Sequence, residues 1–291
     1  MKLLTFRREG VTRLGVLIPE AETEVVEFAE SADMLSLIDA GEDGVAEARN
    51  TVASVTTRTH HLRDVEVLAP LPQPRGNVIA IGRNYRAHAE ESARAAGKAV
   101  DPPTVFTKAV TTIAGPYDDV VIDSTVSSQV DWEVELGVVI GRRGRNIARK
   151  DAPGYVFGYV ALNDVSARDI QFGWGGQFFK GKSLDGYCPT GPWIVTPDEL
   201  PDAQSLRLLL RVNGVVKQDG STRDMIYPVD ALIEWVSKGM TILPGSIMAT
   251  GTPDGVGFAR TPPEFLKPGD VMETEVEGVG TLRNRLVSAA P

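Results

Sequence analysis

The 291-residue sequence contains one cysteine, no long apolar run, and no Lys/Arg-rich run interleaved with aromatic residues. Cys188 alone cannot form an internal disulfide, and the first residues lack the apolar core of a signal peptide, so we expect a cytoplasmic protein. No apolar run approaches the ~18 residues of a membrane helix, so we expect no membrane association. The 39 acidic residues outnumber the 30 basic ones, giving a net charge of -9, which argues against nucleic acid as a partner.

The overall composition is that of an ordinary globular protein, with 42% hydrophobic and 24% charged residues. The segment 70–76 has three prolines and a glycine, which predicts a stiff linker and a domain boundary. We therefore expect a small N-terminal α+β domain over 1–70 and a second domain over 71–291. Strand and turn patterns dominate the second domain, with an Asn213-Gly214 hairpin, an amphipathic helix over 228–238 and two closing strands near 270–287. The predicted fold class is α+β, mostly β.

The segment 130–136, Val-Asp-Trp-Glu-Val-Glu-Leu, alternates acidic and apolar residues. As a strand it would place Asp131, Glu133 and Glu135 on one face, and side chains two residues apart lie roughly 6.6 Å from each other at ~3.3 Å per residue. Carboxylates at that spacing can converge on a divalent cation. The alternative is an exposed acidic face, because charged residues mostly lie in water.

A further carboxylate follows a long apolar strand pattern over 155–162. Asp164 stands at the end of that strand, where it could join Glu133 and Glu135. Its alternative role is to cap the helix that begins there. We expect the neighbouring Asp169 to pair with Arg168 or with solvent.

His88 and Glu91 lie three residues apart in a predicted helix that follows the strand 77–81. At that spacing their side chains can touch, and a carboxylate beside an imidazole selects its tautomer and makes it a better base. The alternative is a surface ion pair. The position at the end of a core strand favours a functional site.

Two glycine-containing segments complete the set of candidates. The segment 172–182 has four glycines among aromatic residues and ends in Lys182, so it could cover a site and present that lysine inward, or be an exposed loop without such a function. Gly251 and Thr252 form a turn at a strand end, whose backbone N–H groups and hydroxyl could hold an anion.

Five motifs occur together in an order typical of one family. They are Gly82-Arg83-Asn84-Tyr85 with His88, Asp131-Trp132-Glu133-Val134-Glu135-Leu136-Gly137, Asn163-Asp164-Val165-Ser166-Ala167-Arg168-Asp169-Ile170-Gln171, Gly181-Lys182-Ser183, and Gly251-Thr252-Pro253. Over about residues 70–287 the chain resembles the fumarylacetoacetate hydrolase family. The resemblance implies a mixed β-roll catalytic domain, a homodimer, and Mg²⁺ or Mn²⁺ used on a small-molecule 2-oxo or dioxo acid.

Carried onto this sequence, the resemblance implies a role for each matching residue. Glu133, Glu135 and Asp164 would be the metal ligands, and Asp131 would have only a supporting or positioning role. His88 with Glu91 would activate water, and Lys182 would offset developing negative charge. The substrate-binding residues would be Gln171, Thr252, Gly251 and Arg83.

The match is closer to the shorter acylpyruvate-type enzymes than to fumarylacetoacetate hydrolase itself. It also extends to hydrolases of 2,4-dioxo-3-deoxy sugar acids, through the run 219–223, Asp-Gly-Ser-Thr-Arg. We therefore expect a metal-dependent hydrolase that cleaves a C–C bond of a 2,4-dioxo acid to pyruvate and a second acid. The alternatives are an oxaloacetate decarboxylase or a 2-oxo acid isomerase that uses the same metal enolate. A non-catalytic metal-binding module is a third possibility.

Overall fold

The computed structural model describes residues 1–18, 23–28, 33–53, 58–96, 104–200 and 202–290. The α-helices are α1 (Met34–Ala40), α2 (Glu42–Ala53), α3 (Arg86–Ala96), α4 (Arg168–Gly173) and α5 (Val229–Ser237). The strands of the first 70 residues are β1 (Lys2–Arg8), β2 (Val11–Leu17), β3 (Glu24–Glu27), β4 (Thr59–His61) and β5 (Glu66–Val67). The later strands are β6 (Val78–Gly82), β7 (Thr104–Lys108), β8 (Ile113–Ala114), β9 (Val120–Ile122), β10 (Val130–Asp131), β11 (Val134–Ile140), β12 (Val156–Asn163), β13 (Ser166–Ala167), β14 (Cys188–Val195), β15 (Arg207–Val212), β16 (Val215–Ser221), β17 (Ile247–Ala249), β18 (Val271–Val276) and β19 (Gly280–Ser288). The expected α+β, mostly β class is confirmed.

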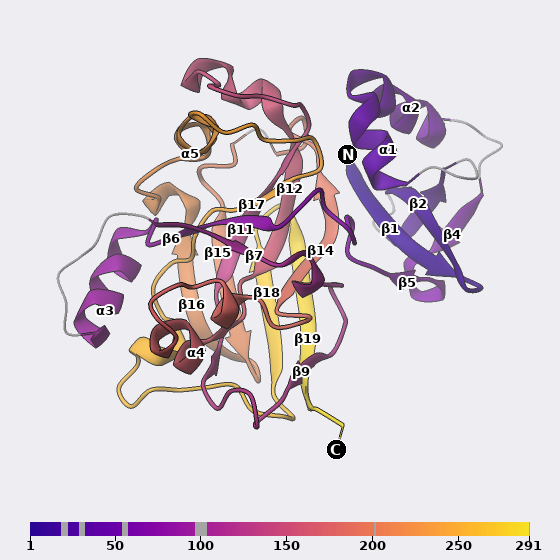
Figure 1. Ribbon diagram of the computed structural model, residues 1–291. Coiled ribbons are helices and arrows are strands. Elements are labelled where there is room, and N and C mark those ends of the chain that lie inside the picture. Colours follow the sequence, from indigo (N-terminus) through magenta and orange to yellow (C-terminus); the bar gives the residue numbers. More distant parts are fainter. Residues whose placement is uncertain (19–22, 29–32, 54–57, 97–103, 201, 291) are drawn as a thin grey trace.

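The strands form three sheets (Figure 1). The largest has the order β4-β3-β2-β1-β14-β12-β11-β17-β6-β7, with β5 beside β1 and β8 beside β14. A second sheet has the order β16-β15-β18-β19-β9, and β10 pairs with β13 in a third. Among the described residues, no helix is long and apolar enough to cross a membrane.

The first 70 residues contribute strands to the largest sheet. Leu3 of β1 pairs with Ile194 of β14, and both belong to one buried apolar cluster. That cluster also contains Leu37 and Ile38 of α1 and Val160 of β12. The N-terminal strands, seen at one side of Figure 1, are therefore joined to the rest of the chain by backbone pairing and by a shared core.

The second sheet packs against β11, β12 and β14 of the largest sheet. Large side chains such as Trp132, Leu136, Leu208 and Leu282 fill the space between them. All seven residues of β11 are buried, because neighbours cover both of its faces. Any polar side chain on β11 must therefore find its partners inside the protein.

The segment 130–136 does not form the single strand that we expected. It divides into β10, which pairs with β13, and β11, which pairs with β12 and β17. The cause is Asp131, whose carboxylate accepts N–H bonds from Trp132 at 2.8 Å and from Gly257 at 2.7 Å and so turns the chain between the two strands. Asp131 is not a member of the carboxylate cluster of Glu133, Glu135 and Asp164, although it shares Arg168 with Glu133.

Other local predictions are confirmed. Asn213 and Gly214 connect β15 to β16 with φ values of 52° and 76°, both in the left-handed region that a tight hairpin turn requires. The amphipathic helix is α5, with Val229, Leu232, Ile233 and Val236 all buried. The two closing strands are β18 and β19.

Gln218 of β16 joins the second sheet to the strand break. Its Oε1 accepts from the N–H of Val134 at 2.9 Å, and its Nε2 donates to Thr252 Oγ1 at 2.8 Å and to the carbonyl of Pro253 at 2.9 Å. Gln218 is almost fully buried. Each of these groups would lose a partner inside the protein if the amide were removed.

Gln218→Ala should therefore lower the free energy of unfolding by about 2–4 kcal/mol, because several buried polar groups are left unpaired. Urea denaturation of the two proteins measures the difference. Val216→Ala is the control, because Val216 lies on the same strand but is half-exposed, and it should change stability by no more than about 0.5 kcal/mol. Equal losses in the two variants would contradict this role of Gln218.

Candidate active site

A pocket of about 450 Å³ gathers most of the candidate residues. Seven of them line it: Arg83, His88, Glu133, Glu135, Gln171, Lys182 and Thr252. The other three are one contact away. Glu91 touches His88, Asp164 touches Lys182, and the N–H of Gly251 donates to Glu135. Residues from all five motifs of the sequence thus meet at one place.

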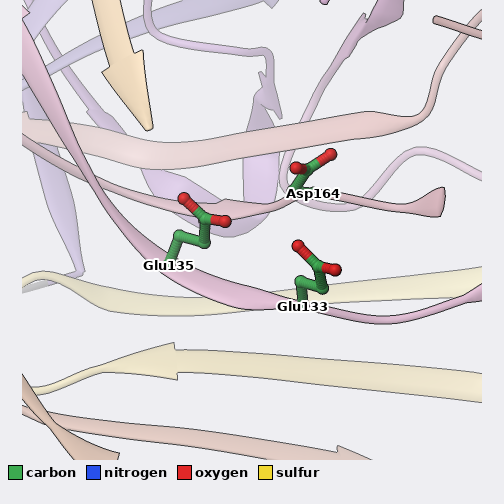
Figure 2. A group of neighbouring side chains, drawn as sticks. All are labelled: Glu133, Glu135 and Asp164. Carbon is green, nitrogen blue, oxygen red and sulfur yellow. The ribbon is translucent and has the colours of Figure 1, made fainter. Parts of the chain in front are cut away.

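The three carboxylates predicted to bind a metal are buried and close together. Glu133, Glu135 and Asp164 each offer an oxygen within 4.8 Å of the others. Figure 2 shows that their carboxyl groups converge, with two side chains from one segment and the third from its neighbour. Pairing of β11 with β12 brings them together, because Val134 lies opposite Asn163 and the N–H of Asp164 donates to the carbonyl of Glu133 at 2.9 Å.

Five ion pairs connect six buried side chains of alternating charge, which we call the ion-pair chain. It runs Asp131–Arg168 (2.8 Å), Arg168–Glu133 (2.7 Å), Glu133–Lys182 (2.9 Å), Lys182–Asp164 (2.8 Å) and Asp164–Lys108 (2.6 Å). Charges removed from water are stable only when they are paired in this manner. The ion-pair chain therefore gives three buried carboxylates a cation partner each.

Glu135 is bound differently from the other carboxylates. Among the described residues no cation is paired with it, and its Oε2 accepts from the N–H of Gly251 at 2.7 Å. Burial and the negative charges of Asp164 and Glu133 raise the pKa of Glu135 well above its usual value. For Glu133, burial also favours the neutral form, but Lys182 and Arg168 outweigh it and lower its pKa to about 2.

The donor set fits a hard divalent cation. Three carboxylate oxygens within reach of one another are the ligands that Mg²⁺ and Mn²⁺ prefer. With all groups ionised, the four carboxylates of this region exceed the three cations of the ion-pair chain by one negative charge, which is centred on Glu135. A cation bound by Glu133, Glu135 and Asp164 would relieve the repulsion that raises the pKa of Glu135.

His88 and Glu91 form the predicted contact on α3. The distance from His88 Nδ1 to Glu91 Oε1 is 3.0 Å, and Glu91 also accepts from the N–H of Gly255 at 3.0 and 3.1 Å. Because an ionised carboxylate can only accept, Nδ1 carries the proton and Nε2 is the basic nitrogen. The hydroxyl of Ser92 lies 3.4 Å from Nε2.

Three of the predicted substrate-binding residues already use polar groups in hydrogen bonds within the protein. Gln171 Oε1 accepts from Arg168, and the hydroxyl of Thr252 donates to the carbonyl of Val134 at 2.8 Å. Gly251 adopts φ 99°, and this turn aims its N–H at Glu135. That N–H therefore holds a carboxylate of the protein itself, in place of the external anion that the turn suggested.

Several residues at the site were not recognised from the sequence. Arg168 bridges Asp131 and Glu133 and stacks on the ring of Phe258, 4.5 Å from its centroid. Asp169 was expected to pair with Arg168 or with solvent; the pair with Arg168 is wrong, because Asp169 accepts from Ser127 Oγ at 2.6 Å. Lys108, fully buried at the end of β7, was also missed. The three-residue spacing of Arg168 and Gln171 on one helix was a usable signal, whereas nothing near Lys108 in the sequence points to Asp164.

Glu133 and Glu135 should respond in opposite ways when each is made neutral. Glu133→Gln breaks two buried ion pairs and should lower the unfolding free energy of the metal-free protein by about 3 kcal/mol or more. Glu135→Gln removes a repelled charge and should stay within about 1 kcal/mol of wild type. Both variants should lose the increase in melting temperature that saturating Mn²⁺ gives the wild type, because each lacks a ligand. A full Mn²⁺ shift in Glu135→Gln would exclude Glu135 as a ligand.

Comparison with known proteins identifies the family of the chain. The family described as fumarylacetoacetate (FAA) hydrolase C-terminal matches residues 77–287. Over 279 residues the chain is 40% identical to the mitochondrial oxaloacetate tautomerase FAHD2A of Bos taurus, covering 96% of this chain and 84% of that protein. Over 227 residues it is 46% identical to the oxaloacetate tautomerase YisK of Bacillus subtilis (strain 168), covering 78% and 75%.

A solved structure extends the similarity to the whole fold. The fumarylacetoacetate hydrolase (EaFAH) from psychrophilic Exiguobacterium antarcticum superimposes with a TM-score of 0.85 at 36% identity, covering 99% of this chain and all of that one. The mixed β architecture, the five motifs and the buried carboxylates thus have one explanation. The chain belongs to the fumarylacetoacetate hydrolase family of enzymes.

Proposed function

We propose that the protein is a metal-dependent tautomerase that interconverts the keto and enol forms of a 2-oxo acid. The observation that carries the proposal is the presence, in one pocket, of a histidine base and a set of buried metal-donor carboxylates. Keto–enol exchange requires a base for the proton on C3 and positive charge near the 2-oxo oxygen. The relatives named oxaloacetate tautomerase support this reaction over the others.

Glu133, Glu135 and Asp164 would hold Mg²⁺ or Mn²⁺, which when bound polarises the 2-oxo group as a Lewis acid. In the keto-to-enol direction His88 removes a proton from C3 through Nε2 and passes it to solvent, and the 2-oxo oxygen takes up a proton from solvent. In the reverse direction the enol oxygen loses its proton to solvent and protonated His88 delivers a proton to C3. Glu91 keeps the proton on Nδ1, and the N–H of Gly255 holds Glu91 in place. Lys182 offsets the charge that develops on the oxygen, while Gln171, Thr252 and Arg83 line the space around the acid.

A second candidate is hydrolysis of the C3–C4 bond of a 2,4-dioxo acid. It is favoured by the same His88–Glu91 pair, which has the arrangement of a general base for water. In that reaction water adds to the C4 carbonyl, the C3–C4 bond breaks, and the electron pair and a proton end on the pyruvate product. Hydrolysis requires a bound water in addition to the groups that tautomerisation uses.

Product analysis separates the reactions. With oxaloacetate and Mg²⁺ or Mn²⁺ we expect faster keto–enol equilibration, seen by ultraviolet absorbance, with no loss of total oxaloacetate beyond the protein-free rate. Release of CO₂ would identify a decarboxylase. Acetate and pyruvate formed from acetylpyruvate would identify a hydrolase. Tight metal binding without turnover of either acid would identify a non-catalytic module.

Removal of the metal should abolish activity. Treatment with excess EDTA followed by dialysis should reduce the rate to the protein-free level, and addition of Mg²⁺ or Mn²⁺ should restore it, because the enolate then regains its stabilising charge. The rate of keto–enol equilibration is the measurement. Undiminished activity in the chelator would rule out the metal-dependent scheme.

His88→Asn should lower kcat by about 10²- to 10⁴-fold, because the base is lost. The increase in melting temperature with Mn²⁺ should persist, since His88 is not among the three donors. Glu90→Gln is the control, because Glu90 lies on the same helix but is exposed, and its activity should equal that of wild type. Loss of the Mn²⁺ effect in His88→Asn would assign His88 to the metal and contradict its role as base.

A further inference from the structure

A buried tryptophan connects the break between β10 and β11 to the turn that follows β17. Trp132 stands at the break and is 1% exposed, and its indole Nε1–H donates to the carbonyl of Gly255 at 3.2 Å. The N–H of the same glycine donates to both carboxylate oxygens of Glu91, at 3.0 and 3.1 Å. Glu91 lies 3.0 Å from Nδ1 of His88. These four residues form a continuous series of hydrogen bonds that begins in the interior and ends at the imidazole.

Gly255 lies where a larger residue would not fit. Its φ is 98°, in the left-handed region, and a Cβ at this position would collide with the carbonyl oxygen of Lys217. Arg260 Nη2 donates to that carbonyl at 2.7 Å and lies 3.4 Å from the carbonyl of Gly255. The tight turn lets one residue use both of its backbone groups, the carbonyl toward Trp132 and the N–H toward Glu91.

The indole ring is held by charged neighbours. Lys217 Nζ and Arg260 Cζ each lie 5.9 Å from the centroid of the ring, and Glu264 pairs with both cations, at 2.6 and 3.9 Å. The residue before the tryptophan, Asp131, accepts from the two N–H groups of the segment 257–258, at 2.7 and 3.0 Å. The break between β10 and β11 therefore binds the turn at two places, and the indole N–H has a fixed direction.

We propose that Trp132 is a positioning residue for the base: it holds Glu91 through Gly255, and Glu91 keeps the proton of His88 on Nδ1. This inference rests on the proposed function, because it takes His88 as the base. The hydrogen bond made by one ring nitrogen of a histidine decides which nitrogen carries the proton. If the carboxylate of Glu91 turned away, Nε2 could take that proton and would then be unable to accept one from C3. The described residues that line the pocket do not include Trp132, so its effect passes through these contacts.

Trp132→Phe removes the indole N–H and keeps an aromatic ring in the core. In this variant kcat for oxaloacetate tautomerisation should fall by about 10- to 100-fold, because a small displacement of the base is enough for such a loss. KM should stay within about 3-fold of wild type, since binding of the acid is not affected. Trp193→Phe is the matched control: it removes another indole N–H that donates to a backbone carbonyl, that of Val279 between β18 and β19, and should leave kcat unchanged. An unchanged kcat in Trp132→Phe, or an equal loss in the control, would overturn the proposal.

A double-mutant cycle tests whether Trp132 acts through Glu91. In a protein that already carries Glu91→Gln, Trp132→Phe should lower kcat by less than about 3-fold, because residues that act in one series have non-additive effects. If the two losses instead multiply, Trp132 contributes only to packing and the proposal fails. Replacement of Trp132 by benzothienylalanine, which has sulfur in place of the N–H and nearly the same shape, should give the same loss of kcat as Trp132→Phe. This replacement tests the bond even if the phenylalanine variant does not fold.

NMR of the histidine rings separates this inference from the proposed function. The chain has three histidines, so labelling of histidine with ¹⁵N gives few signals, and His88→Asn assigns those of His88. At a pH where the ring is neutral we expect the proton on Nδ1 in wild type and on either nitrogen in Trp132→Phe. If wild type turns over neither oxaloacetate nor acetylpyruvate, the proposed function fails while this change still supports the role of Trp132. An unchanged position of the proton in Trp132→Phe would overturn the inference and leave the proposed function intact.

Discussion

Four carboxylates lie close together in the interior of the protein, and the rest of the structure depends on how their negative charges are compensated. Asp131, Glu133, Glu135 and Asp164 are all buried, and charges removed from water at such short range strongly repel. The ion-pair chain meets this need for three of them with Arg168, Lys182 and Lys108. Among the described residues Glu135 has no paired cation, and it accepts from the backbone N–H of Gly251. With all of these groups ionised the region has one negative charge in excess, and the crowding that raises the pKa of Glu135 would be relieved by a divalent cation.

Much of the surrounding fold serves to hold these charges in place. The break between β10 and β11 turns Asp131 toward Arg168, and the pairing of β11 with β12 sets Asp164 beside Glu133. Gly181 permits the close approach behind Lys182, since a Cβ there would lie 2.5 Å from the backbone nitrogen of Gln171. Burial of β11 on both faces keeps water from screening the charges, so each contact remains strong.

The pocket separates the groups that hold charge from the group that moves a proton. Glu135 lies on β11, Glu133 and Asp164 lie next to strand ends, and Lys182 lies in a short 3-10 helix, whereas His88 and Glu91 lie on α3. Because the base is on a different element, it can approach a bound acid from a side that the metal donors do not occupy. The N–H of Gly255, donated to Glu91, ties the helix to the turn that follows β17 and thereby fixes the orientation of the imidazole.

The sequence by itself determined the fold class, the Asn213-Gly214 hairpin and the helix α5, because hydrophobic periodicity and turn chemistry are local properties. It also offered Glu133, Glu135 and Asp164 as a donor set through the family resemblance, and the pairing of β11 with β12 brings these three together. Only the tertiary structure decided which cation meets which carboxylate. Lys108 lies 56 residues from Asp164, and Asp131 left its expected strand face because Gly257, far along the chain, offered it a backbone N–H. Such pairings depend on three-dimensional register and on the low dielectric of the interior, and neither is written in the spacing of residues along one strand.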